Sequence, residues 1–216
     1  MKNKLLKGAH LSERKCREII HLFCEDLTAT EIANVTGVSR VTINAYMKMI
    51  RIRLALFCDD AFPLHFLPSN HLLLKHNPTE LPVTAYYGFA NWNGLVFSTG
   101  LANMDREALQ SWQKQEKNEG LYNMLDLDAV ADFTNWCLFR KEGLPNRIAR
   151  PAPDDISGFW ALTRSRLMKF RGLNRNTLYL HIKECEYRFN YRHEDLQYKL
   201  LQMIHTEPLQ ELQASA

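Results

Sequence analysis

A dense set of hydrogen-bonding and basic side chains lies between residues 39 and 53. These side chains are Ser39, Arg40, Thr42, Asn44, Tyr46, Lys48, Arg51 and Arg53. Arginine can bind the edge of guanine through two parallel hydrogen bonds, and asparagine can do the same for adenine. Basic side chains further along a helix reach phosphate oxygens instead. If this segment is a helix with these side chains outward, its chemistry suits contact with double-stranded DNA.

Local capping and turn signals predict the helices that would position these side chains. Thr28 and Glu31 form a capping-box pattern, in which the hydroxyl and the carboxylate each bind a free backbone amide. A short helix is expected to run from there to about Thr36. Gly37 then suits a tight turn with a positive φ angle, and Ser39 is the expected N-cap of the next helix.

Small and apolar residues around this turn indicate close helix packing. Ala33 would let the two helices approach each other, and Val38 and Ile43 would fill the space between them. A further helix is expected before them, over residues 12–26. Two short helices joined in this way predict a helix-turn-helix, whose second helix places its first turns in the major groove. An ordinary helical hairpin with a charged face is the alternative interpretation.

The net charge of +3 is distributed unevenly along the chain. Lys and Arg outnumber Asp and Glu by 10 to 5 in residues 1–53 and by 12 to 5 in residues 139–193, but are outnumbered by 10 to 4 in residues 54–138 and by 4 to 1 in residues 194–216. Basic segments bind the phosphate backbone by releasing its counterions. The second basic segment is either another DNA-contacting surface or a solvated face. Its candidate residues are Arg164, Arg166, Lys169, Arg171 and Arg175.

The helix and strand patterns predict an α+β fold with two domains, a helix-turn-helix domain over residues 1–60 and a larger domain over residues 61–216. Prolines punctuate residues 60–82, which should form a connection with at most a short strand. The elements expected after it are a hairpin of strands at 83–90 and 95–101, a helix at 105–118, a strand at 121–127, and helices at 154–170 and 176–191. In the last helix, the core stripe is expected to be Leu178, Ile182, Cys185 and Phe189.

Several stretches resemble ISXO-like bacterial insertion-sequence transposases. The most specific are Gly158–Gly172 and Thr177–Arg192, which are similar to the carboxy-terminal end of that family. Leu27–Ala33 resembles its helix-turn-helix, and Tyr86–Phe89 with the Asn93–Gly94 turn resembles its second and third core strands. The resemblance implies a ribonuclease-H-like core with a DDE-type site, in which three acidic or amide side chains hold two metal ions.

The positions that correspond to those three metal ligands hold one carboxylate. Ser69 stands where the resemblance implies the first acid, Asp128 fits the second, and Ser157 occupies the third. One carboxylate cannot hold two divalent ions. The resemblance therefore implies a degenerate triad without a metal or other cofactor, with Asp128 as a residual catalytic candidate. Mg²⁺ is expected only if nearby carboxylates restore a shifted site; these are Asp126, Asp154 and Asp155.

Other features of the chain argue against several classes of protein. The five cysteines are far apart and form no zinc-binding pattern. No run of about 18 apolar residues would cross a membrane, and the first residues lack the pattern of a secretion signal. We therefore expect a cytoplasmic, nucleoid-associated bacterial protein with reduced thiols.

These expectations combine into one main hypothesis. The chain would be a catalytically silent, transposase-derived protein that binds specific sequences in double-stranded DNA and regulates transcription. It would act as a homo-oligomer, with a dimer favoured because two half-sites multiply specificity. The alternative hypothesis is an active, metal-dependent DDE transposase with relocated ligands.

Overall fold

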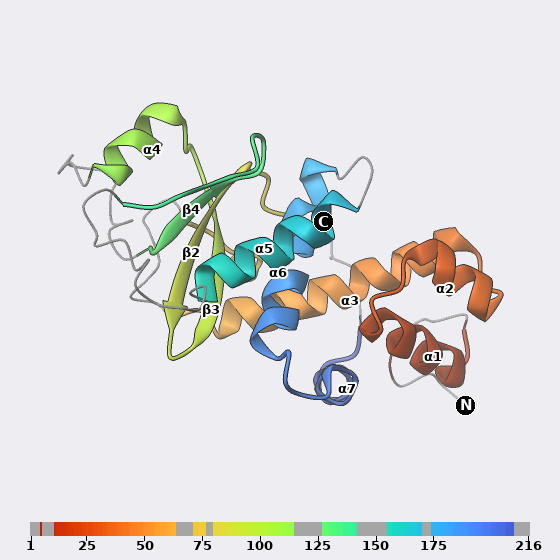
Figure 1. Cartoon of the computed structure of the whole chain (residues 1–216). Coiled ribbons are helices and arrows are strands. Elements are labelled where there is room, and N and C mark those ends of the chain that lie inside the picture. Colours follow the sequence, from red (N-terminus) through yellow and green to blue (C-terminus); the bar gives the residue numbers. More distant parts are fainter. Residues whose placement is uncertain are drawn as a thin grey trace.

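The computed structural model describes residues 5, 11–63, 71–76, 80–114, 127–141, 155–169 and 174–209, which form a mixed α+β structure (Figure 1). The elements are α1 (Glu13–Cys24), α2 (Ala29–Thr36), α3 (Arg40–Asp60), β1 (His71–Leu72), the 3₁₀ helix η2 (Leu74–His76), β2 (Tyr86–Trp92), β3 (Leu95–Leu101), α4 (Arg106–Gln113), β4 (Ala129–Asp132), β5 (Cys137–Phe139), α5 (Asp155–Met168), α6 (Arg175–Asn190) and α7 (Leu196–Thr206). The predicted α+β class is confirmed. No helix among the described residues is both long and apolar enough to cross a membrane.

The strands form one sheet in the order β1-β3-β2-β4-β5, with every neighbouring pair antiparallel. The predicted hairpin between β2 and β3 is confirmed. Asn93 and Gly94 have φ angles of 51° and 78°, the left-handed values that a two-residue turn between twisted strands needs. The first strand of the hairpin begins at Tyr86, three residues later than position 83. The strand expected at 121–127 lies almost wholly outside the described residues, and β4 begins at Ala129.

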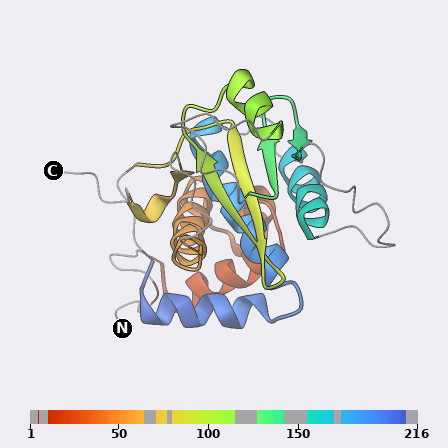
Figure 2. The same cartoon turned by 90° about the vertical axis from the view of Figure 1, so that its left-hand side faces the viewer.

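Helices cover both faces of this sheet. Tyr87 and Phe89 of β2 point to one face and pack in a core with α3, α5 and α6. Ala90 points to the other face and packs with Leu109 and Trp112 of α4. In Figure 1, the sheet lies between α4 and the group of α3, α5 and α6, and Figure 2 shows the sheet in front of that group. The predicted core stripe of α6 is confirmed, because all four of its side chains are buried.

A second core lies at the helical end of the molecule. Ile20 of α1, Ile32 of α2 and Ile43 of α3 pack there with Leu200 of α7, and all four are buried. Burying a large aliphatic side chain of this kind contributes about 1.5–3 kcal/mol. α7 was not predicted from the sequence, and it lies along α1 at the base of the view in Figure 2.

Helix α3 belongs to both cores. Its first half supplies Ile43 and Ile50 to the helical end, and its second half supplies Ile52 and Ala55 to the core beside the sheet. The helix has 21 residues, so it is about 30 Å long. A domain boundary at residue 60 stays a prediction. Helix α3 ends at that residue and lies in the first segment, but it packs in both cores.

Candidate nucleic-acid interface

The turn between α2 and α3 is fixed by local hydrogen bonds. The Glu31 amide donates to Thr28 Oγ1 at 3.3 Å and the Thr28 amide donates to Glu31 Oε2 at 2.7 Å, which is the predicted capping box. The Thr28 hydroxyl also donates to Glu31 Oε2 at 2.7 Å, and the bonds from the Thr28 amide and hydroxyl lower the pKa of the Glu31 carboxyl. Gly37 has a φ of 70°, so a residue with a side chain would be strained there. The Thr42 amide donates to Ser39 Oγ at 3.2 Å, which confirms Ser39 as the N-cap of α3.

The first turns of α3 present one exposed face. Arg40, Asn44 and Lys48 are exposed, as the sequence predicts, and within the described residues none of the three has an ion-pair partner. Ser39 is exposed as well, while Thr42 is half-buried and shares a 2.9 Å hydrogen bond with the Ser39 hydroxyl. This face has hydrogen-bonding groups and positive charge available to a ligand.

Two further exposed side chains complete this face, and sequence reasoning missed both. Val41 is 79% exposed, and Ala45 is also exposed. The signal was available, because positions 41, 44, 45 and 48 follow the three- and four-residue spacing of one helical face. The prediction considered only polar and basic side chains of this segment, so it omitted these two apolar ones.

Tyr46 and Arg51 were expected to point outward, and that expectation is wrong. Tyr46 is 6% exposed, and its hydroxyl accepts a hydrogen bond from Cys16 Sγ at 3.8 Å. Burial raises the pKa of this hydroxyl. Arg51 is 9% exposed and its Nε lies 2.7 Å from Glu184 Oε2. Both side chains face the protein interior because they follow the buried stripe of α3.

Arg53 also has a partner within the protein. Its Nη1 lies 2.6 Å from Glu207 Oε2, and its side chain is 15% exposed. Its guanidinium therefore joins α3 to the end of α7. Of the eight predicted DNA-contacting residues, the structure places Ser39, Arg40, Asn44 and Lys48 on the open face with Thr42 at its edge.

The residues of the possible second basic surface do not all lie on the outside of the protein. Arg164 and Lys169 are exposed. Arg166 points inward, where it binds Asp26 at 2.5 Å and Glu184 at 2.9 Å, so its expected place on an outer surface is wrong. Arg175 is exposed, donates to Thr134 Oγ1 at 3.4 Å, and lines a cavity of about 360 Å³. Arg171 lies outside the described residues.

Glu184 is the centre of a buried ionic cluster that joins the two ends of the molecule. Arg51 of α3, Arg166 of α5 and Arg188 of α6 bind its carboxylate at 2.7, 2.9 and 2.9 Å. Burial alone would raise the pKa of Glu184, but the three guanidinium groups outweigh it and hold that pKa well below its usual range. The Glu184 carboxylate is therefore charged at neutral pH.

The same cluster anchors the end of α1. Arg188 donates to the carbonyl oxygens of Phe23 at 2.6 Å and Cys24 at 2.9 Å. Carbonyls in the last turn of a helix have no partner within the helix, so Arg188 satisfies them. Together with the pair between Arg166 and Asp26, which follows α1, these bonds hold the α1–α2 corner against α6.

Two of the four predicted acidic candidates, Asp128 and Asp155, meet at Asn91. Its backbone amide donates to Asp128 Oδ2 at 2.7 Å, and its side-chain amide donates to Asp155 Oδ2 at 3.0 Å. Ser157 Oγ accepts a hydrogen bond from Arg140 Nη2 at 3.1 Å, which places a positive charge at the position implied for the third ligand. Within the described residues, no three acidic, histidine or cysteine side chains are placed to share a metal ion. Ser69, Asp126 and Asp154 lie outside those residues.

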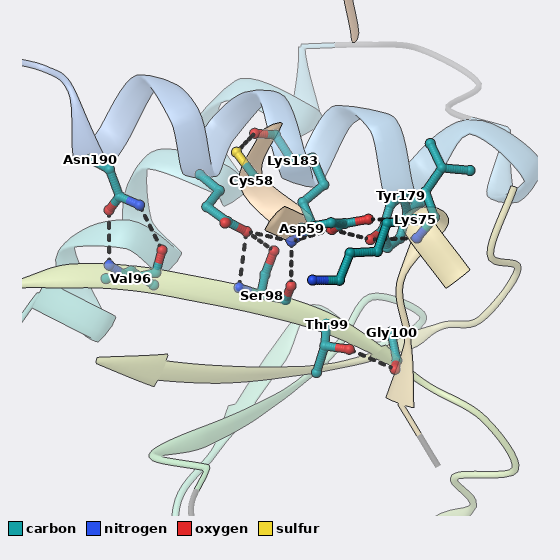
Figure 3. Close-up of polar contacts among 12 residues, drawn as sticks. Cys58, Asp59, Lys75, Val96, Ser98, Thr99, Gly100, Tyr179, Lys183 and Asn190 are labelled. Carbon is teal, nitrogen blue, oxygen red and sulfur yellow. Dashed lines mark hydrogen bonds and ion pairs between the residues drawn. The ribbon is translucent and has the colours of Figure 1, made fainter. Parts of the chain in front are cut away.

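A second group of reactive side chains surrounds Lys183, as Figure 3 shows. Its Nζ lies 3.0 Å from Asp59 Oδ1, 3.0 Å from Glu186 Oε2 and 2.6 Å from the Ser98 carbonyl oxygen. The Tyr179 hydroxyl donates to Asp59 Oδ1 at 2.7 Å. Such a set could suggest general acid–base chemistry.

Burial and charge indicate a structural role for this group. The Lys183, Asp59 and Glu186 side chains are at most 1% exposed, so a substrate has no access to them. Burial alone would lower the pKa of Lys183, but Glu186 and Asp59 outweigh it, and the pKa is raised. The ammonium therefore stays protonated and cannot act as a base.

Comparison of the chain with models of protein families, with curated proteins and with solved structures gives no match.

Proposed function

We propose that this protein binds specific sequences in double-stranded DNA, and that α2, the turn at Gly37 and α3 act as a helix-turn-helix. The observation that carries this proposal is the exposed face of α3. Arg40, Asn44 and Lys48 point to solvent there, whereas Arg51, Arg53 and Arg166 each bind a carboxylate of the protein.

Each side chain on this face has a role that follows from its chemistry. Arg40 and Asn44, in the first turns of the helix, reach base edges in the major groove, where they bind guanine and adenine. Lys48, one turn further on, binds phosphate. Ser39 and Thr42 have hydroxyl groups that suit phosphate oxygens at the start of the helix.

Packing favours a role in reading DNA, because it supports the helix that carries the exposed face of α3. The α1–α2 corner is tied to α6 by Arg188, and α3 continues into the core beside the sheet. A reading helix must present its side chains in one fixed orientation if it is to discriminate between bases. Arg164 and Lys169 on α5 could supply additional phosphate contacts.

The wider proposal is a catalytically silent protein derived from an insertion-sequence transposase, with a ribonuclease-H-like core, that regulates transcription in the bacterial nucleoid as a dimer. One contact supports the loss of catalysis, because Ser157 accepts a hydrogen bond from Arg140. A guanidinium beside the third ligand position would repel a divalent cation.

One observation favours the alternative, an active metal-dependent transposase. Asp128 and Asp155 both bind Asn91, so two carboxylates and an amide lie together. Incubation of the protein with its DNA and Mg²⁺ or Mn²⁺ separates the two proposals. Cleavage or strand transfer that Asp128→Ala abolishes would establish the enzyme, and binding without either reaction supports the silent protein.

Selection from a randomised duplex library, followed by footprinting on the enriched sequence and genome-wide mapping, tests the main proposal. We expect one enriched motif and protection of its major groove. A failure to enrich any duplex at moderate salt would refute it.

A further inference from the structure

The exposed face of α3 carries two apolar side chains among its polar ones. Val41 and Ala45 are one helical turn apart, and Asn44 lies between them on the same face. Val41 is 79% exposed, whereas Ile43 and Ile50 of the same helix are fully buried. Val41 contributes no hydrophobic burial to the fold of the described residues, because no other side chain covers it.

The surroundings of these two side chains indicate what covers them. Arg40 and Lys48 flank them, and the six exposed residues of the face carry two positive charges and no carboxylate. A polyanion therefore suits this face better than an ordinary protein partner does. Apolar side chains facing a polyanion need an apolar group on that ligand.

We propose that Val41 and Ala45 contact thymine methyl groups, so that the DNA site of this protein contains A·T base pairs at the centre of the contacted segment. This inference rests on the proposed function of the same face. In the major groove the C5 methyl group of thymine is the apolar feature that a base pair presents. Asn44 is placed to bind the N6 and N7 atoms of an adenine next to these thymines.

Helix geometry limits the spacing of the two contacts. Four residues of α-helix advance about 6 Å along the axis, and successive bases on one strand are about 3.4 Å apart. Val41 and Ala45 therefore contact thymines about two base-pair steps apart or closer. A cytosine in either place would present an amino group whose hydrogen bond an apolar side chain cannot replace.

Deoxyuridine substitution tests this inference, because uracil differs from thymine only by the missing methyl group. The full-length protein is titrated with its selected duplex and with duplexes in which single thymines are replaced by deoxyuridine. We expect one or two positions at which the Kd rises about fourfold. This is the loss of affinity expected when one buried methyl group is removed. For Val41→Ala, the difference between thymine and uracil should disappear at one of those positions.

Val83→Ala is the matched control, because Val83 is also exposed but lies outside the proposed helix-turn-helix. This variant should keep the uracil profile of the wild type. Specific binding with no uracil-sensitive position would overturn the thymine contacts and leave the proposed function standing. Failure to bind any duplex would remove both. A change in sedimentation of Val41→Ala with unchanged DNA affinity would assign the face to a protein contact and overturn the inference.

Discussion

The ammonium of Lys183 in α6 lies 3.0 Å from the carboxylate of Asp59 in the last turn of α3. Both side chains are buried. Helix α3 therefore begins at the exposed face around Asn44 and ends in an ion pair inside the core. The ion pair ties the last turn of α3 to α6, and the first turns of the same helix carry the face that we propose to read DNA.

Replacing Arg40 or Asn44 tests the base contacts of that face. Each of Arg40→Ala and Asn44→Ala should weaken binding to the selected duplex by about 1–3 kcal/mol, because each removes a two-bond contact to a base. Repeating the duplex selection should show relaxed preference at one position for each variant. Arg106→Ala, which removes an exposed arginine from α4 on the other side of the sheet, serves as the control. Equal affinity for wild type and both variants would refute their assignment to base edges.

Lys48 should contribute without regard to sequence. Lys48→Ala should weaken all duplexes alike and reduce the slope of log K against log salt by about 1, because one phosphate contact is lost. Arg51→Ala provides the contrast, since its guanidinium is bound to Glu184 rather than exposed. This variant should lower the free energy of unfolding and leave the salt slope unchanged. If the salt slope is reduced for Arg51→Ala and unchanged for Lys48→Ala, Arg51 and not Lys48 contacts phosphate.

Lys183 should be among the most sensitive positions for stability. Lys183→Met leaves Asp59 and Glu186 buried without their cation, which should cost about 3–5 kcal/mol in urea denaturation. The surface variant Lys199→Met, which removes a partner of Glu194, should change stability by less than about 1 kcal/mol. Adding Asp59→Asn and Glu186→Gln to Lys183→Met should restore part of the loss. If it restores nothing, charge is not the reason for the effect.

His181 makes stability depend on pH. Burial, together with the charge of Arg51, lowers the pKa of its ring from 6.5 to about 4. Between these values the unfolded chain binds a proton that the folded protein does not, so stability should fall as pH drops from 6.5 to 4. Above 6.5 both states are neutral and this residue adds no slope. Urea denaturation at several pH values should show a shallower decline for His181→Gln, and identical slopes would count against this source of the pH dependence.

Much of the fold could be predicted because its signals are local. Thr28 and Ser39 cap their helices as expected, Ser12 caps the helix predicted over residues 12–26, and Gly37 makes the turn. The hairpin at Asn93–Gly94 was readable for the same reason. β5 was missed, since three residues are too few for a periodic pattern. α7 was missed although Leu200, Met203 and Ile204 have helical spacing.

The candidate site was only partly predictable. Residue type alone made Arg51 and Arg166 candidates for DNA contacts and gave no reason to place Val41 among them. In the structure both arginines bind Glu184 and point inward, whereas Val41 is exposed. Whether a charged side chain is exposed depends on a partner that is far away in sequence, such as Glu184 for Arg51.

The sequence by itself therefore determined the caps, the turns, the apolar stripes and the segment that carries the candidate face, because each depends on neighbours within about one helical turn. Only the tertiary structure decided which side chains of α3 are free. Burial of an arginine or lysine is tolerated when a carboxylate from another element lies within ion-pair distance. That pairing arises when α3, α5 and α6 pack together, and it leaves Arg40, Asn44 and Lys48 as the exposed polar residues at the start of the helix.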